Sequence, residues 1–166
     1  MPGSSSPTFR VGGGYDAHRF CEGRRLVLCG VEIDGQRGLA GHSDADVGTH
    51  AVMDALLGAA GAGDIGELFP DTDASYAGAS SIGLLRRVVA RLAADGWRVG
   101  NLDVTFVCEQ PRLSTYRGAM RETLAEALGV RPDAVSVKAT TTEGMGFEGR
   151  GEGIAAHAVC LLADLE

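Results

Sequence analysis

Apolar residues recur at two spacings along this chain, at alternate positions in some stretches and at every third or fourth position in others. Alternation is typical of half-buried strands, and the longer spacing is typical of amphipathic helices. Strands are predicted over residues 9–15, 26–29, 31–33, 98–107, 134–140 and 154–162. Helices are predicted from 42–44 to about 60, over about 80–95 and over about 115–128. This mixture predicts an α+β domain, a mixed sheet with three helices packed on one side.

Glycine is the most over-represented residue type. The chain has 25 glycines among 166 residues, about twice the usual share of roughly 7%. Three of them, Gly12, Gly13 and Gly14, follow one another inside the first predicted strand. Because glycine has no Cβ, we expect the backbone to pass close to another group or to turn sharply at many of these positions.

Composition and charge exclude several classes of protein. Lys and Arg total 15 against 22 for Asp and Glu, a net charge of −7, whereas a nucleic-acid surface needs clustered positive charge. No apolar run approaches the roughly 18 residues of a membrane span. The four cysteines are far apart and form no CxxC pair, which favours reduced thiols in a cytoplasmic protein. Residues 1–8 are expected to be a disordered extension, and residues 9–166 a single domain.

The pair Asp16 and His18 is the first candidate for a metal site, at the predicted end of the first strand. Residues two apart in an extended chain point to the same side, with Cα atoms roughly 6.5–7 Å apart. A carboxylate and an imidazole so placed can bind one metal ion. A surface ion pair is the alternative interpretation.

Four more polar residues, His42, Asp46, His50 and Asp54, recur every four positions along the first predicted helix. They are expected to line one face of it, although a solvated polar face has the same spacing. His42 and His50 would lie about 12 Å apart along the axis, too far to share one metal ion. His50 suits a ligand role with Asp46 and Asp54 as supporting carboxylates, and His42 suits a substrate anion at the helix start. Two histidines and one aspartate leave a zinc ion an open position.

The segment from Lys138 to Glu143 ends a predicted strand with three threonines and a carboxylate. Hydroxyls and bare backbone amides suit phosphate oxygens, and Glu143 suits Mg²⁺. The alternative interpretation is a threonine-rich strand end with a solvated glutamate that binds no ligand. The nearby GxGxxG spacing at 144–149 lies too close to the C-terminus for a dinucleotide-binding unit, and Ser43 beside His42 does not form a catalytic triad.

Taken together, these motifs resemble the 2-C-methyl-D-erythritol 2,4-cyclodiphosphate synthase family of the non-mevalonate isoprenoid pathway. The resemblance runs from about residue 9 to the C-terminus. Its motifs are GYDAH at 14–18, HSDADV at 42–47, His50, DALLG at 54–58, GDIG at 63–66, LFPDTD at 68–73, NLDVT at 101–105, KATTTE at 138–143 and GRGEG at 149–153.

The resemblance implies a homotrimer whose sheets face the threefold axis and whose active sites lie between neighbouring subunits. It implies conversion of 4-diphosphocytidyl-2-C-methyl-D-erythritol 2-phosphate into the cyclic 2,4-diphosphate and CMP. Zn²⁺ or another divalent transition metal would be held by Asp16, His18 and His50. Mg²⁺ or Mn²⁺ would lie between Glu143 and the substrate diphosphate.

The resemblance also assigns substrate contacts, with His42 and Thr141 as catalytic stabilisers of the transition state. The implied substrate-binding residues are Asp16, His18, His42, Ser43, Asp64, Ile65, Gly66, Phe69, Pro70, Asp71, Thr72, Asp73, Cys108, Glu109, Gln110, Pro111, Arg112, Leu113, Ser114, Thr140, Thr141, Thr142, Glu143, Phe147 and Arg150. Those from Cys108 to Ser114 would form the cytosine pocket. The chain departs from the family at His157, where some relatives carry glutamate in the cavity on the trimer axis.

Two other functions are compatible with the same residues. A metal phosphohydrolase would use the His/Asp site to activate water, and a non-catalytic trimeric module would carry a structural zinc. The open zinc position and the phosphate-binding segment favour the synthase over both.

Overall fold

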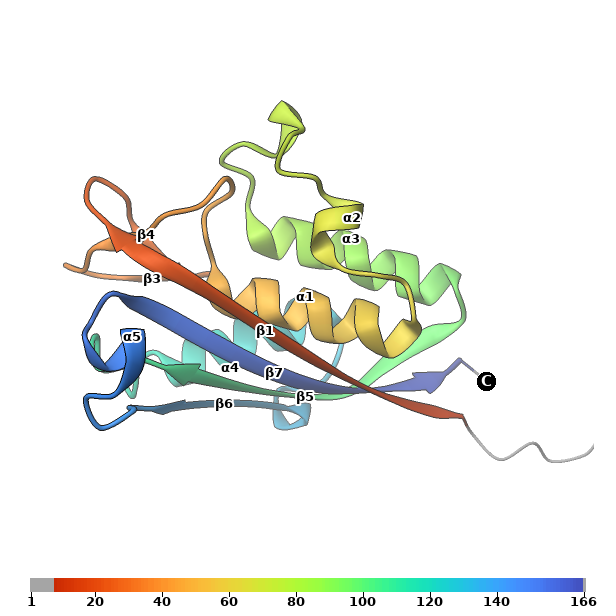
Figure 1. Ribbon diagram of the computed structural model, residues 1–166. Helices are drawn as coiled ribbons and strands as arrows, with labels where there is room; N and C mark the ends of the chain where they lie inside the picture. The colour runs from red at the N-terminus through yellow and green to blue at the C-terminus, as the bar shows by residue number, and fades with distance from the viewer. Residues whose placement is uncertain (1–7, 166) are drawn as a thin grey trace, which may run out of the picture.

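The computed structural model describes residues 8–165 and is built on a five-stranded sheet with the order β4-β1-β7-β5-β6 (Figure 1). Its strands are β1 (Phe9–Cys21), β4 (Gly38–Leu39), β5 (Trp97–Val107), β6 (Val135–Thr140) and β7 (Gly153–Asp164). β5 and β6 are parallel and the other pairs are antiparallel, so the sheet is mixed, as predicted. β2 (Leu26–Leu28) and β3 (Val31–Ile33) form a separate hairpin. Of the extension expected over residues 1–8, all but Thr8 lies outside the described residues.

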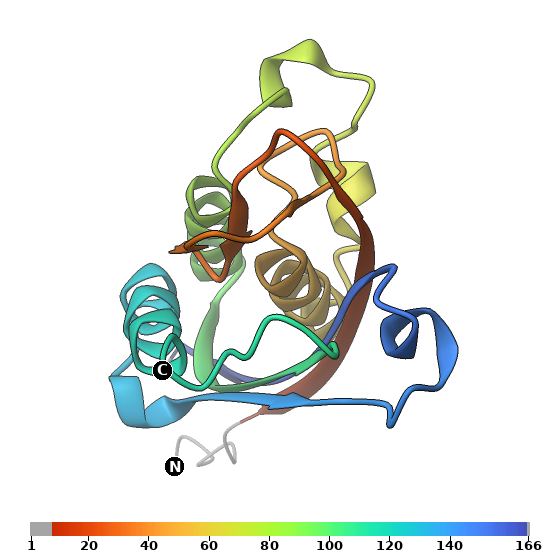
Figure 2. The same cartoon turned by 90° about the vertical axis from the view of Figure 1, so that its left-hand side faces the viewer.

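Three long helices lie on one side of the sheet, as the sequence predicts (Figures 1 and 2). They are α1 (Val47–Ala60), α3 (Ser81–Ala94) and α4 (Arg117–Leu128). The short elements are α2 (Ile65–Leu68), α5 (Gly146–Gly149) and the 3₁₀ turns Ala74–Tyr76 and Pro132–Ala134. No helix within residues 8–165 is long and apolar enough to cross a membrane.

The glycines of β1 allow α1 to pack directly on the strand backbone. A Cβ on Gly14 would lie 1.9 Å from the carbonyl oxygen of Ala51, and one on Gly12 would lie 1.9 Å from that of Ala55. Carbon and oxygen do not approach so closely, so a side chain at either glycine would push the helix away. Gly13 points to the other face, where the nearest atom to a Cβ is 4.0 Å away. The expectation of close backbone approach is therefore confirmed at these two glycines.

Two element boundaries differ from the sequence predictions near the site. β1 continues to Cys21 because it pairs with β7 as far as Arg19 and with β4 at Phe20 and Cys21. Asp16 and His18 therefore lie within the strand and not at its end. α1 begins at Val47, and its N-cap is Asp46 instead of Ser43 or Asp44.

The buried Asp46 carboxylate explains the late start of α1. It accepts hydrogen bonds from the backbone N–H and hydroxyl of Thr49 and from the backbone N–H groups of Cys29 and Gly30. Burial raises the pKa of Asp46, and its hydrogen bonds oppose that shift. Asp46 thus ties the turn between β2 and β3 to the first turn of α1.

The face of the sheet opposite α1 exposes apolar side chains. Phe9, Val11 and Tyr15 alternate along β1, and Val159 lies opposite Gly13 on β7. Their side chains are 50–69% exposed. On the same face, the ring centroids of His157 and Tyr15 are 4.8 Å apart, with the ring planes tilted by 58°. A contiguous exposed apolar surface of this kind is typical of a face that contacts another protein.

Candidate functional site

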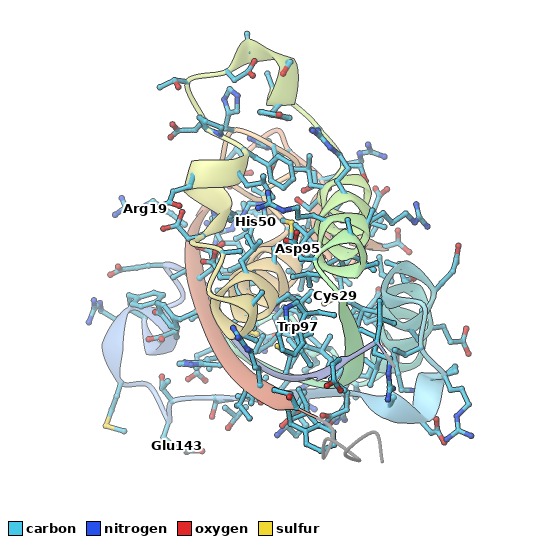
Figure 3. All side chains as sticks on the ribbon, turned by 90° about the vertical axis from the view of Figure 1, so that its right-hand side faces the viewer. Arg19, Cys29, His50, Asp95, Trp97 and Glu143 are labelled. Carbon is cyan, nitrogen blue, oxygen red and sulfur yellow. The ribbon has the colours of Figure 1, made fainter. Side chains whose placement is uncertain are left out.

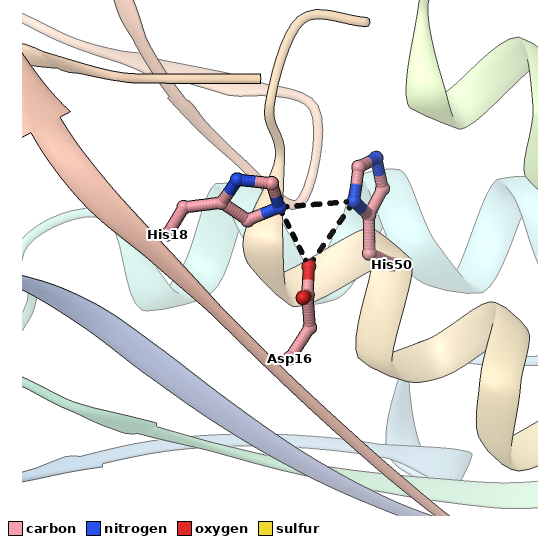
Figure 4. Close-up of side chains that lie close together, drawn as sticks. All are labelled: Asp16, His18 and His50. Carbon is pink, nitrogen blue, oxygen red and sulfur yellow. Dashed lines mark hydrogen bonds and ion pairs between the residues drawn. The ribbon is translucent and has the colours of Figure 1, made fainter. Parts of the chain in front are cut away.

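Asp16, His18 and His50 converge on one point between β1 and α1 (Figure 4). Strand alternation directs Asp16 and His18 toward α1, the same face as Gly12 and Gly14. His18 Nε2 lies 2.8 Å from Asp16 Oδ2, and His50 Nδ1 lies 3.1 Å from the same oxygen. The two imidazole nitrogens are 3.3 Å apart. The close helix–strand contact at the glycines therefore assembles the site.

These three side chains fit a divalent transition metal. Their ligand atoms all lie within 4.8 Å of one another, compatible with bonds of about 2 Å to a shared ion. His18 Nδ1 lies 2.7 Å from the carbonyl oxygen of Ala40. Because a carbonyl only accepts, Nδ1 carries a proton, and Nε2, which faces Asp16 and His50, is the nitrogen available to a metal ion. Three protein ligands leave a position for a further ligand.

The electrostatics of the site couple the carboxylate to the imidazoles. Burial raises the pKa of Asp16, but hydrogen bonds and charges from His18 and His50 outweigh it, and the pKa lies well below its usual range. Burial lowers the pKa of His18, yet the Asp16 hydrogen bond and charge leave it raised overall. Asp16 and His18 therefore stabilise each other's charged forms.

The far nitrogen of His50 contacts two serine hydroxyls. Nε2 lies 3.1 Å from Ser43 Oγ and 3.0 Å from Ser81 Oγ. The prediction that Asp46 and Asp54 support His50 is therefore wrong. Asp46 is used as the helix cap, and Asp54 accepts from the backbone N–H of Ile65 at 2.9 Å.

His42 and Ser43 belong to a loop that precedes α1, so the four-residue recurrence does not place His42 on the helix. Arg24 holds this loop by donating to the carbonyl oxygens of Gly41 and Ser43. His42 Nε2 lies 3.3 Å from the carbonyl oxygen of Asp73. His42 therefore does not lie at the start of α1, which Asp46 caps. Its expected contact with a substrate anion stays a prediction, and His42 lines the cavity beside His18 and His50.

A cavity of about 520 Å³ opens beside the metal ligands His18 and His50. Of the residues expected to bind substrate, it is lined by His18, His42, Ser43, Ile65, Gly66, Phe69 and Asp71. Asp64, Pro70, Thr72 and Asp73 lie on the same loop but not in its lining, and Asp64 is the N-cap of α2. We name this cavity with Asp16, His18 and His50 the metal half-site.

A second cavity, of about 440 Å³, lies at the C-terminal ends of β5 and β6. Its lining contains every residue from Cys108 to Ser114 together with Arg117, Ala139, Thr140 and Thr141. The adjoining turn is held by Glu109, whose Oε1 accepts from the N–H groups of Thr142 at 3.3 Å and Gly144 at 3.2 Å. We name this cavity with residues 140–143 the phosphate half-site.

The two half-sites are separate within one chain. Their linings have no residue in common, and Figure 3 shows His50 and Glu143 in different parts of the molecule. The Glu143 carboxylate is exposed and accepts from the Thr141 hydroxyl at 3.3 Å. Phe147 lies beside His18 in a small hollow, and Arg150 lies in another hollow with Glu109.

Several residues of these half-sites were not predicted from the sequence. Ser81 and Asp44 contact each other behind His50, and Tyr76 lines the metal half-site. Ser81 sits in the first turn of a helix, where serine is common as a cap. No spacing in the sequence connects it to His50.

An α+β domain with a two-histidine, one-carboxylate centre open to a cavity belongs to the class of metal-dependent enzymes. Residues 9–163 match the YgbB family. The 2-C-methyl-D-erythritol 2,4-cyclodiphosphate synthase of Methylococcus capsulatus is 64% identical over 155 residues, covering 93% of this chain and 98% of that protein. The chain belongs to the YgbB family of 2-C-methyl-D-erythritol 2,4-cyclodiphosphate synthases, and the resemblance of its motifs is confirmed.

Solved structures give the same relationship. The bifunctional IspDF of Campylobacter jejuni superposes with a TM-score of 0.94 at 41% identity, covering 97% of this chain and 44% of that chain. The present chain therefore spans less than half of that bifunctional protein. IspF of Plasmodium falciparum in its CDP complex superposes with a TM-score of 0.84 at 30% identity, covering 98% and 100%. These relatives do not support the phosphohydrolase alternative.

Proposed function

We propose that this protein converts 4-diphosphocytidyl-2-C-methyl-D-erythritol 2-phosphate into 2-C-methyl-D-erythritol 2,4-cyclodiphosphate and CMP. Residues 9–166 act as one synthase domain, and the working form is a homotrimer in the cytoplasm. Zn²⁺ is held by Asp16, His18 and His50, and Mg²⁺ or Mn²⁺ by Glu143 with the substrate diphosphate. The observation that carries this proposal is the convergence of Asp16, His18 and His50 beside a cavity in a chain 64% identical to a synthase.

The reaction needs no nucleophile from the protein. An oxygen of the substrate's 2-phosphate attacks the β-phosphorus, the bond from that phosphorus to the CMP oxygen breaks, and CMP leaves with the electron pair. Catalysis therefore consists of positioning a flexible anion and stabilising its charge. The metal ions, when bound, supply Lewis-acid stabilisation of phosphate oxygens.

Residues of both half-sites bind and position the substrate. In the metal half-site, His42 and Ser43 contact phosphate, and the 64–66 and 69–73 segments hold the erythritol end. In the phosphate half-site, residues 108–114 enclose the cytosine ring, and the hydroxyls and backbone of residues 140–142 hold the diphosphate. Phe147 and Arg150, which lie outside the linings of both half-sites, are further substrate contacts. His42 and Thr141 stabilise the transition state.

The homotrimer is supported by two features. The exposed apolar face with Phe9, Val11, Tyr15 and Val159 suits burial against copies of the same chain. The two half-sites share no lining residue within one chain, so one substrate that needs both would bridge two copies. The cytoplasmic assignment is supported by the four cysteines, all of which are free thiols.

Product analysis tests the proposed reaction. Purified protein is incubated with the cytidylyl substrate and Mg²⁺, and the phosphorus species are resolved by ³¹P NMR. The proposal expects the cyclic diphosphate and CMP from the wild type, and neither from His50→Ala. Linear phosphates would identify a phosphohydrolase, and an unchanged substrate would refute the enzymatic function.

A further inference from the structure

A hydrogen-bonded chain of three residues leads away from the metal half-site into the protein interior. His50 Nε2 lies 3.0 Å from Ser81 Oγ, and Ser81 is completely buried. The Ser81 hydroxyl donates to Asp44 Oδ1, and the Ser81 backbone N–H donates to Asp44 Oδ2 at 2.9 Å. We name this arrangement the Asp44–Ser81–His50 relay.

The relay determines which nitrogen of His50 carries its proton. A hydroxyl has one proton, and the Ser81 hydroxyl uses it to donate a hydrogen bond to the Asp44 carboxylate, which can only accept. Ser81 Oγ must then accept from His50, so the proton lies on Nε2. When a metal ion is bound, Nδ1, which lies 3.1 Å from Asp16 Oδ2, is then left with its lone pair for the ion. The carbonyl of Ala40 has the matching effect on His18, so both imidazoles present lone pairs to one point.

Ser43, the other neighbour of His50 Nε2, does not determine which nitrogen of the imidazole carries the proton. Ser43 Oγ lies 3.1 Å from His50 Nε2 and accepts from the backbone N–H of Ala45 at 3.2 Å. No carboxylate takes the hydroxyl proton of Ser43, so this hydroxyl is compatible with either form of the imidazole. Of the two hydroxyls, only that of Ser81 must accept a hydrogen bond from His50 Nε2.

We propose that Ser81 and Asp44 are positioning residues of the metal centre, which hold His50 in the tautomer that binds a metal through Nδ1. This inference rests on the proposed metal site and concerns residues that touch neither metal nor substrate. Outer hydrogen bonds of this kind orient a ligating imidazole and increase its basicity, and their loss weakens metal affinity by about 10–100-fold.

The experiment measures zinc affinity of the full-length protein by competition with a chromophoric chelator. Ser81→Ala is expected to bind zinc about 10–100-fold more weakly than wild type. Ser80→Ala is the matched control, because the exposed Ser80 caps the same helix through Gly83 but does not contact His50. The control is expected to keep wild-type affinity.

Two further measurements separate positioning from general damage to the fold. Asp44→Asn is expected to weaken zinc binding, and the double variant with Ser81→Ala to lose no more than Ser81→Ala alone, because Asp44 acts through Ser81. In ¹⁵N NMR of the zinc-loaded protein, the His50 Nε2–H proton is expected to be protected from exchange in wild type and in Ser80→Ala. It is expected to exchange rapidly in Ser81→Ala.

The outcomes distinguish this inference from the proposed function. Wild-type zinc affinity in Ser81→Ala with a protected Nε2–H would overturn the relay and leave the metal site intact. Independent, additive losses in the double variant would also overturn it. Absence of zinc binding by the wild type would overturn the metal site, and the relay with it.

Discussion

Replacing Gly14 by alanine should separate α1 from β1 and disable the metal half-site. The new Cβ would lie 1.9 Å from the carbonyl oxygen of Ala51 and 2.7 Å from the backbone N of Ala55. Contacts under 3.0 Å are essentially never observed, so the helix must move by about 1 Å relative to the strand. Both clashing atoms belong to backbone, which no rotamer change can remove.

The magnitude follows from this geometry. Overpacking a core costs about 1–3 kcal/mol and occasionally more, and a clash with helix backbone belongs at the upper end. We therefore expect Gly14→Ala to lower the free energy of unfolding by about 3 kcal/mol. The same displacement moves His50 Nδ1 away from Asp16 and His18, so zinc affinity should fall by more than about 10-fold.

Gly58→Ala is the matched control from the opposite side of the same contact. Its Cβ would be 3.9 Å from the carbonyl oxygen of Gly13, an ordinary distance, and alanine favours the interior of α1 by about 1 kcal/mol. Urea unfolding followed by circular dichroism at fixed protein concentration, with zinc affinity by chelator competition, compares the variants. Wild-type stability and zinc affinity in Gly14→Ala would refute the packing argument.

Three other perturbations test separate parts of the structure. Asp46→Ala leaves the buried N–H groups of Cys29 and Thr49 without their acceptor, so chemical unfolding should show a loss of more than about 3 kcal/mol; a loss below 1 kcal/mol would contradict the cap assignment. The raised pKa of His18 stabilises the metal-free protein below about pH 6.5 and ceases to do so as the pH rises through the raised pKa. Zinc affinity should instead increase with pH. Thermal melting of the metal-free protein and zinc titration, both between about pH 6 and 8, check the two pH dependences. Glu143→Gln should raise the Mg²⁺ concentration needed for half-maximal CMP release, and an unchanged Mg²⁺ titration would count against Glu143 as a ligand.

Local spacing was sufficient to predict the three long helices and six of the seven strands within residues 8–165, and it singled out Asp16, His18 and His50, which the structure brings together. The alternation of Asp16 and His18 in a strand places both side chains on one face whatever the exact strand end. The helical distance used to separate His42 from His50 does not apply, because His42 lies in the loop before α1. Among the described residues, the structure nevertheless groups His50 with Asp16 and His18 and not with His42. The glycines of β1 indicated close backbone approach, although not which helix would approach.

Tertiary contacts explain what local spacing could not predict. Asp46 has the helical spacing of a residue that supports His50. Its carboxylate instead accepts a hydrogen bond from the backbone N–H of Gly30, 16 residues away in sequence. Ser81 reaches His50 across 31 positions of sequence, and no periodicity encodes that contact. The start of α1 was placed too early because Ser43 and Asp44 are good caps by residue type, while burial of Asp46 decides the actual boundary.

The central claim is that each active site combines the metal half-site of one copy with the phosphate half-site of its neighbour. The most direct measurement mixes two variants, His50→Ala and Glu143→Ala, after unfolding and co-refolding them in equal amounts, and follows CMP release. Each variant alone should be nearly inactive. The mixture should recover about a quarter of wild-type activity, because a quarter of the interfaces pair two intact half-sites. Inactivity of the refolded mixture, with wild type refolded in parallel fully active, would contradict the shared site.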